Sequence, residues 1–214
     1  MRLAELSRRS GVSTATIKYY LREGLLPSGR QINATTAEYD EEHLRRLRLV
    51  RAMIQVGGVP VTKVREVLGH VDDDSLPRTI RLGAALWALP QVPEPDEDDE
   101  YVQAAHQEVD ALLDRLGWKN AKRLTTISPA YRSLVVAVAA FRRIGYDFGA
   151  ELLAPYAELM FRTAVLDLDN METYPSQAER IEFAILGAIL NEPVLQALHR
   201  LAQEEETARR YGFE

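Results

Sequence analysis

Along most of this chain, apolar residues recur at intervals of three and four, which places them on one face of an α-helix. From residue 128 onward no segment shows the strict polar–apolar alternation of a β-strand. The connections between these periodic segments are short, so neighbouring helices are expected to be antiparallel. The pattern predicts a mostly α-helical protein whose C-terminal part is entirely helical.

The first two predicted helices are short and are joined by a tight turn. Leu6 marks the first helix, and Gly11 supplies the turn after it. The second helix begins after Ser13, whose hydroxyl can accept a hydrogen bond from an unpaired N–H group of the first turn. Gly24 ends this helix, and Pro27 prevents it from resuming. This is a helix-turn-helix pattern.

The second helix has little apolar surface. Ile17 and Leu21 form one narrow apolar stripe, whereas the other faces carry hydroxyl, amine, guanidinium and phenol groups. Such a helix fits the major groove of DNA, where its polar groups meet phosphates and base edges. Helix pairs around a glycine also occur in domains that bind no nucleic acid, so the pattern alone leaves both interpretations open.

Residues 15–27 read ATIKYYLREGLLP, which resembles the second-helix signature of the MerR family of bacterial transcription regulators. The resemblance covers residues 1–70 and implies a winged helix-turn-helix domain that binds double-stranded promoter DNA as a homodimer. It also implies indirect action on RNA polymerase: ligand binding distorts the duplex so that polymerase can engage both promoter elements. The sequence names neither the operator nor the effector.

Residues 28–43 are rich in Ser, Gly, Asn and Thr and predict a loop or a short β-hairpin. Relatives carry a two-stranded wing here, and the resemblance places Arg30 and Tyr39 in it and Arg45 on the following helix. The usual glycine-tyrosine-arginine trio is replaced around residues 35–38, so its arginine is missing. The predicted DNA-binding residues are Ser13, Thr14, Thr16, Lys18, Tyr19, Tyr20, Arg22, Arg30, Tyr39 and Arg45.

Two further regions follow: a linker with candidate dimerisation helices at 71–127, and a helical bundle at 128–214 as a candidate effector-binding domain. Pro90, Pro93 and Pro95 interrupt the long dimerisation helix of the family. A helix resuming near residue 98 carries a coiled-coil-like row of about two heptads, which packing inside one subunit explains equally well. Its members are Val102, Ala105, Val109, Leu112 and Leu116. Within the bundle, one helix is expected to end at Asn191 and the next to begin at Pro193.

Charge is distributed unevenly along the chain. Residues 1–70 hold 12 Lys and Arg against 7 Asp and Glu, whereas residues 71–214 hold 14 against 25. A basic N-terminal region and an acidic remainder are expected if only the N-terminal region binds DNA.

The N-terminus lacks the apolar region of a signal peptide, and no uninterrupted apolar run has the length of a membrane span. We therefore expect a cytoplasmic protein that does not engage a membrane.

The residues give little indication of catalysis. The chain has no cysteine and four isolated histidines, and it lacks phosphate-binding, dinucleotide-binding and nucleophile motifs. We expect no enzyme activity, no metal site and no cofactor; an enzyme with a vestigial N-terminal DNA-binding domain is the remotest alternative.

The C-terminal helices could bind a small-molecule effector among aromatic residues, although ordinary core packing explains the same residues. These candidates are Trp87, Trp118, Tyr131, Phe141, Phe148, Tyr156 and Met160. The alternative function is a DNA-bound adaptor whose helical domain binds another protein.

Overall fold

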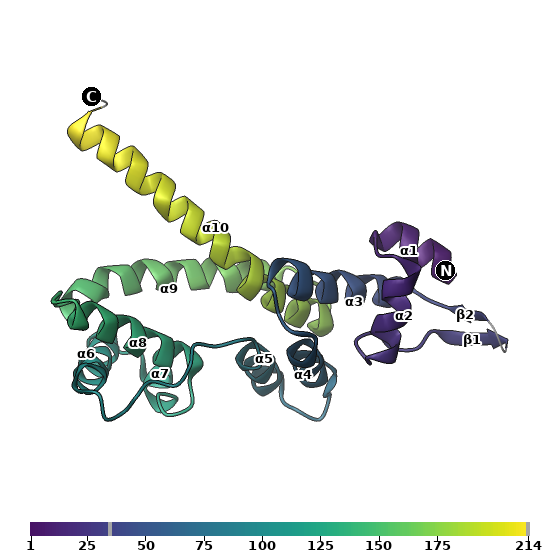
Figure 1. Ribbon diagram of the computed structural model, residues 1–214, viewed down its shortest axis with the longest axis horizontal. Helices are drawn as coiled ribbons and strands as arrows, with labels where there is room; N and C mark the ends of the chain where they lie inside the picture. The colour runs from purple at the N-terminus through teal and green to yellow at the C-terminus, as the bar shows by residue number, and fades with distance from the viewer. Residues whose placement is uncertain (34–35, 213–214) are drawn as a thin grey trace. The chain divides into compact units, whose positions relative to one another are not determined.

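The computed structural model describes residues 1–33 and 36–212, and its contacts divide the chain into two compact units (Figure 1). Unit 1 combines Met1–Leu89 with Tyr174–Glu214, and unit 2 is Pro90–Thr173. Unit 1 therefore joins the two ends of the sequence, while unit 2 is a single continuous segment.

The predicted helix-turn-helix opens unit 1. Helix α1 spans Leu3–Ser10 and helix α2 spans Thr14–Arg22. Gly11 ends α1 with a left-handed conformation at φ +67°. The Ser13 hydroxyl accepts a hydrogen bond from the Thr16 amide at 3.1 Å, as the capping argument predicted.

A two-stranded antiparallel hairpin follows α2 and confirms the predicted wing. Strands β1 (Arg30–Asn33) and β2 (Thr36–Glu38) pair with Arg30 opposite Glu38. Gly29 is needed where β1 begins, because a Cβ there would lie 2.7 Å from the Glu38 carbonyl oxygen and 2.9 Å from the Tyr39 ring. Thr35, within the replaced trio, lies outside the described residues.

Three more helices and a π-helical turn complete the N-terminal part of unit 1. Asp40 caps the first of them, accepting hydrogen bonds from the Glu42 and His43 amides at 3.0 and 3.1 Å. His43 Nδ1 accepts in return from the Asp40 amide at 3.3 Å, which closes a capping box. The elements are α3 (Glu41–Arg51), the π-helical turn η1 (Ala52–Val56), α4 (Val61–Asp72) and α5 (Arg78–Trp87).

The core of unit 1 extends well beyond residue 70. Ile17 and Leu47 are fully buried in it, and so are Ala85 of α5 and Ile185 from the C-terminal helix. The predicted division at residues 70 and 127 is therefore not the division of contacts found in the structure. The reason is that α4 and η1 leave apolar surface, which α5 and the C-terminal helix cover.

That C-terminal helix, α10, is continuous over Gln177–Tyr211, so the expected break between Asn191 and Pro193 is wrong. Proline has a helical φ and removes a single N–H donor, so strong helix formers on both sides can carry a helix through it. Of the helices described, α10 is the one long and apolar enough to cross a membrane by length and composition. Ile181 and Ile185 of α10 are core residues, whereas 11% of its apolar 18-residue window is buried.

Unit 2 is a small helical bundle around one core. The predicted row on α6 is buried inside it against α8 and α9, together with Val135, Val138 and Leu153. Of the two interpretations of this row, packing within the subunit is the one observed. The elements are α6 (Glu100–Leu116), α7 (Lys119–Arg123), α8 (Pro129–Arg143) and α9 (Ala150–Glu172). Pro155 lies inside α9, and Ser128 caps α8.

Candidate nucleic-acid interface

Helix α2 separates a buried face from a polar one. Ile17 is completely buried and Tyr20 is 4% exposed, because both pack into the core of unit 1. Thr14, Lys18 and Arg22 are exposed and follow one another at intervals of four residues. Residues four apart lie on the same face of a helix, so these three side chains form one polar row toward solvent.

The two cations of this row differ from most other cations of unit 1. Neither Lys18 nor Arg22 has a hydrogen bond or ion pair with any residue that the structure describes. By contrast, Arg9 pairs with Glu41 on α3, and Arg65 donates to the Glu23 carbonyl at 2.9 Å. The unpaired charges of α2 are therefore available to a polyanion, whereas the paired arginines hold the unit together.

The adjacent tyrosines occupy different environments. Tyr19 is 36% exposed beside the polar row, and its ring lies 5.9 Å from that of Tyr20 at an angle of 51°. Burial raises the pKa of the Tyr20 phenol above its ordinary value. Tyr20, which the sequence predicted as a DNA-binding residue, has its side chain in the core of unit 1.

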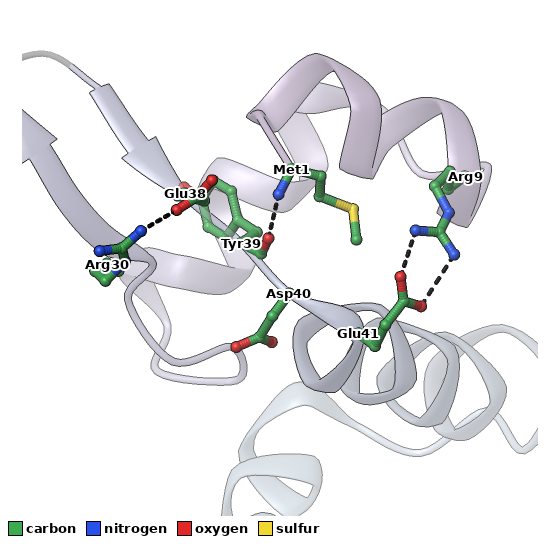
Figure 2. A pocket seen from close by; sticks show the side chains of 7 residues that line it. All are labelled: Met1, Arg9, Arg30, Glu38, Tyr39, Asp40 and Glu41. Carbon is green, nitrogen blue, oxygen red and sulfur yellow. Dashed lines mark hydrogen bonds and ion pairs between the residues drawn. The ribbon is translucent and has the colours of Figure 1, made fainter.

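A hollow of about 470 Å³ lies where the wing meets α1 and α3 (Figure 2). Around it, Arg30 pairs with Glu38, the Met1 amino group donates to the Tyr39 carbonyl at 2.5 Å, and Arg9 pairs with Glu41. The guanidinium groups of Arg30 and Arg9 hold the pKa values of Glu38 and Glu41 below their usual range. The Met1–Tyr39 contact joins the end of the wing to the start of the chain, whereas Arg30–Glu38 lies within the wing and Arg9–Glu41 links α1 to α3.

The three DNA-binding residues predicted outside α2 are placed differently from one another. Arg30 is exposed at the base of the wing. The Tyr39 side chain is 7% exposed and packs edge-on against His43, with ring centroids 5.2 Å apart. Arg45 faces helix α10, where its guanidinium nitrogens lie 3.6 Å from carboxylate oxygens of both Glu179 and Glu182. Only Arg30 therefore remains presented to solvent near α2.

Sequence reasoning missed the exposed strand of the wing. Every residue of β1 is exposed, including Gln31 and Ile32. Ile32, an apolar residue, has 46% of its surface exposed. The polar composition of the segment predicted a loop or a short hairpin, but which side chains it exposes depends on the register of the strands.

The predicted effector residues are divided between the two units. Trp87 belongs to unit 1, and the other six belong to unit 2. Trp118 contacts Phe161, with ring centroids 5.9 Å apart, and Tyr131 stacks on His106 at 5.5 Å. Met160 is exposed. Phe141, Phe148 and Tyr156 form a continuous row of rings, with centroids 4.6 and 6.1 Å apart.

Comparison with known proteins agrees with this geometry. A family model described as the MerR HTH family regulatory protein matches residues 1–70. A crystal structure of a protein assigned as a transcriptional regulator, SCO5550 from Streptomyces coelicolor A3(2), is 67% identical in sequence. That similarity covers 100% of this chain and 99% of SCO5550, with a TM-score of 0.86. Residues 1–70 of this chain form a MerR-family HTH domain.

Curated MerR-type relatives match only the front of the chain. The transcriptional regulator AdhR of Bacillus subtilis (strain 168) is 30% identical over 57 residues, which are 27% of this chain and 41% of AdhR. The mercuric resistance operon regulatory protein of Bacillus cereus is 32% identical over 73 residues, or 34% and 54% of the two chains. The match therefore spans about half the length of these MerR-type relatives, or less.

Among the described residues, no group of three His, Asp or Glu is placed to hold a metal ion.

Proposed function

We propose that this chain is a cytoplasmic transcription regulator that binds promoter DNA by placing α2 in the major groove. The observation that carries the proposal is the exposed row of Thr14, Lys18 and Arg22, whose cations have no partner among the described residues. In this arrangement Ser13, Thr16 and Tyr19 contact the backbone or base edges beside the row. The exposed wing strand lies against the neighbouring phosphates.

The test is to select fragments from a genomic library with the purified full-length chain and to measure binding to the enriched sequence by fluorescence anisotropy. Lys18→Ala is expected to weaken binding at least about tenfold at 0.15 M salt. The matched control is Lys119→Ala, which removes an exposed lysine from unit 2. Equal affinities of the two variants would remove α2 from the interface, and no enriched sequence would contradict DNA recognition itself.

The proposal includes a homodimer acting on RNA polymerase through the shape of the promoter. Reading two half-sites in one duplex needs two copies of α2, since one short helix contacts only a few base pairs. Distortion of the DNA between the half-sites then alters polymerase access without a direct contact. Potassium permanganate footprinting of the promoter with and without the protein tests this part.

Unit 2 is proposed to sense a small apolar or aromatic molecule at the row of Phe141, Phe148 and Tyr156. Phe141 and Tyr156 are 41% and 53% exposed, so a planar ligand can stack on the row. The competing function is an adaptor whose unit 2 binds another protein, which the exposed Leu159, Phe161 and Leu166 of α9 favour. A ligand that raises the melting temperature supports the sensor, because binding to the native state stabilises it. Pull-down of a defined protein by wild type but not by Leu159→Asp supports the adaptor.

A further inference from the structure

The C-terminal end of α2 is held by an arginine of another helix. Arg65 of α4 donates from Nε to the backbone carbonyl of Glu23 at 2.9 Å and from Nη2 to the Glu23 carboxylate at 2.5 Å. Glu23 follows the last residue of α2, Arg22, which belongs to the exposed polar row. One guanidinium group therefore joins α4 to both the main chain and the side chain at the end of the helix proposed to enter the groove.

These two bonds fix the direction of α2 as well as its position. A guanidinium group is planar and presents its N–H donors in a rigid fork, so a pair of bonds to one residue defines an orientation. Arg65 is itself held in place, because its neighbour Val64 is fully buried in the core of unit 1. Leu25 and Leu26 anchor the chain after α2 by apolar burial, which is not directional. The contact of Arg65 thus limits rotation of α2 about its own axis.

A second arginine holds the chain at the other end of α2. Arg51 of α3 donates from Nη1 to the backbone carbonyl of Ser10 at 3.2 Å and from Nε to the Gln55 side chain at 2.6 Å. A Cβ on Gly11 would lie 3.1 Å from the same Nη1, so the turn that leads into α2 packs against this side chain. Arginines of α3 and α4 therefore fix the two ends of α2, while the exposed row between them faces solvent.

Reading bases makes a strict demand on the orientation of a helix. A group that recognises its target by hydrogen bonds has to be placed within about 0.5 Å and about 10–20° of the productive geometry. Attraction to phosphates is less demanding, because it is electrostatic and carries no sequence information. A rotation of α2 about its axis displaces Lys18 and Arg22 together. Loss of the Arg65 contact is thus expected to reduce the preference for the operator more than the attraction to DNA as such.

We propose that Arg65 is a positioning residue for DNA recognition: it fixes the orientation of α2 through Glu23 and makes no contact with the DNA. The proposal rests on the proposed function, in which α2 lies in the major groove. Two other roles of Arg65 predict different results. In the first, this side chain, which is 49% exposed, binds a phosphate; in the second, it neutralises the Glu23 carboxylate, which would otherwise repel the DNA.

The experiment compares the affinity of the full chain for its operator with that for a scrambled duplex of equal length, at a temperature where all variants are folded. R65A is expected to lower this ratio at least about tenfold. R65K is expected to lower it similarly, because an ammonium group keeps the charge and lacks the planar fork. R65A/E23Q, which removes both charges, is expected to lose the ratio as R65A does and to keep the wild-type salt slope.

Each competing role has an outcome that overturns the proposal. Recovery of the ratio in R65K or in R65A/E23Q would make Arg65 a neutralising charge. A slope of log affinity against log salt that is flatter by about one unit in R65A/E23Q would make it a phosphate contact. An unchanged ratio in R65A overturns the proposal outright. The matched control is R209A, which removes the arginine of an exposed two-bond pair with Glu206 on α10 and is expected to leave the ratio unchanged.

Hydrogen exchange tests the position of α2 without DNA. The amides of Glu23, Gly24 and Leu25 bond to carbonyls of α2, so release of its end exposes them to solvent. R65A is expected to speed exchange in residues 19–26 at least about fivefold and to leave α1 unchanged. Equal exchange in R65A and wild type overturns the proposal. A wild type with no preference for any duplex contradicts the proposed function, and the exchange result then decides the role of Arg65 at α2 by itself.

Discussion

At the scale of single residues, neighbouring side chains on one helix have opposite surroundings. Lys18 and Tyr20 are two positions apart on α2; Lys18 is exposed with no partner among the residues that the structure describes, while Tyr20 is buried. The stripe of Ile17 and Leu21 was enough to predict which face of α2 is buried. The burial of Tyr20 was only partly predicted, because it depends on how closely the neighbouring helices approach.

Lys18→Ala and Tyr20→Phe are expected to have different signatures across a panel of single-base operator changes. Lys18→Ala is expected to relax preference at one position by about 1–3 kcal/mol, as loss of a base contact does. Tyr20→Phe is expected to weaken all sequences alike by roughly 1 kcal/mol, since its hydroxyl at the edge of the core can reach a phosphate. If Lys18→Ala weakens binding to all operator variants equally, Lys18 contacts a phosphate and not a base edge.

The wing provides a second prediction at this scale. Arg30→Ala is expected to flatten the slope of log affinity against log salt by about one unit, because one phosphate contact is lost. Glu38→Gln is the informative partner, since it frees Arg30 from its ion pair and is expected to strengthen binding. Anisotropy titrations between 50 and 300 mM salt measure both, and an unchanged slope for Arg30→Ala places this residue away from the DNA backbone.

At the scale of elements, local signals predicted where helices begin better than where they end. The Ser13 cap was predicted from the sequence, and the caps at Asp40, Ser128 and Ser176 are likewise contacts within three residues. The end expected before Pro193 was wrong, since continuation depends on the rest of the helix. The spacing of the apolar residues on α6 could not show whether they form a coiled coil or pack inside one subunit, because both arrangements need the same spacing.

The cap of α3 makes stability depend on pH. The hydrogen bond from His43 lowers the pKa of Asp40 in the folded state, so this carboxylate stabilises the protein above its unfolded pKa of about 3.9. The contribution is lost as the pH falls through the folded value. Asp40→Ala is expected to cost about 1 kcal/mol at pH 7 and progressively less as the pH falls below about 3.9. Urea unfolding across this pH range measures it, and a cost that does not fall with pH contradicts the cap.

The approach of α10 to η1 can be tested at Gly57. Gly57→Ala is expected to destabilise unit 1 by about 1–3 kcal/mol, because the new methyl group would overlap Ile189 and lie 3.0 Å from the Met53 carbonyl oxygen. Gly69→Ala is the control: a Cβ there meets nothing within 4 Å, so this helical substitution is expected to stabilise by about 1 kcal/mol. Differential scanning calorimetry compares them, and similar changes for both would mean that α10 does not press on Gly57.

At the scale of the whole molecule, unit 1 is assembled from the two ends of the sequence. Contacts between residues more than one hundred positions apart leave no periodic signal, so the role of residues 174–212 in unit 1 could not be predicted. The family signature predicted the wing and α2, but it ends near residue 70. The core continues to Ala85, Ala88, Ile181 and Ile185.

A fragment of residues 1–70 is therefore expected to be less stable than unit 1 in the full chain. It lacks Ala85 of α5 and also Ile181 and Ile185 of α10, and each buried Ile side chain contributes about 1.5–3 kcal/mol. Urea unfolding followed by circular dichroism, with the full chain as reference, is expected to show a lower midpoint for the fragment. Identical midpoints would mean that the helix-turn-helix and wing fold independently of the C-terminal helix.

The position of Pro193 has a mechanical consequence. It lies between the part of α10 that is packed in the core and the part that projects from it, and it removes one backbone hydrogen bond at that joint. The projecting arm of Val194–Tyr211 is about 27 Å long. A change in bend of about 20° at the joint moves the tip by roughly 9 Å. A small change in the bend of α10 at Pro193 therefore produces a large displacement of its C-terminal end.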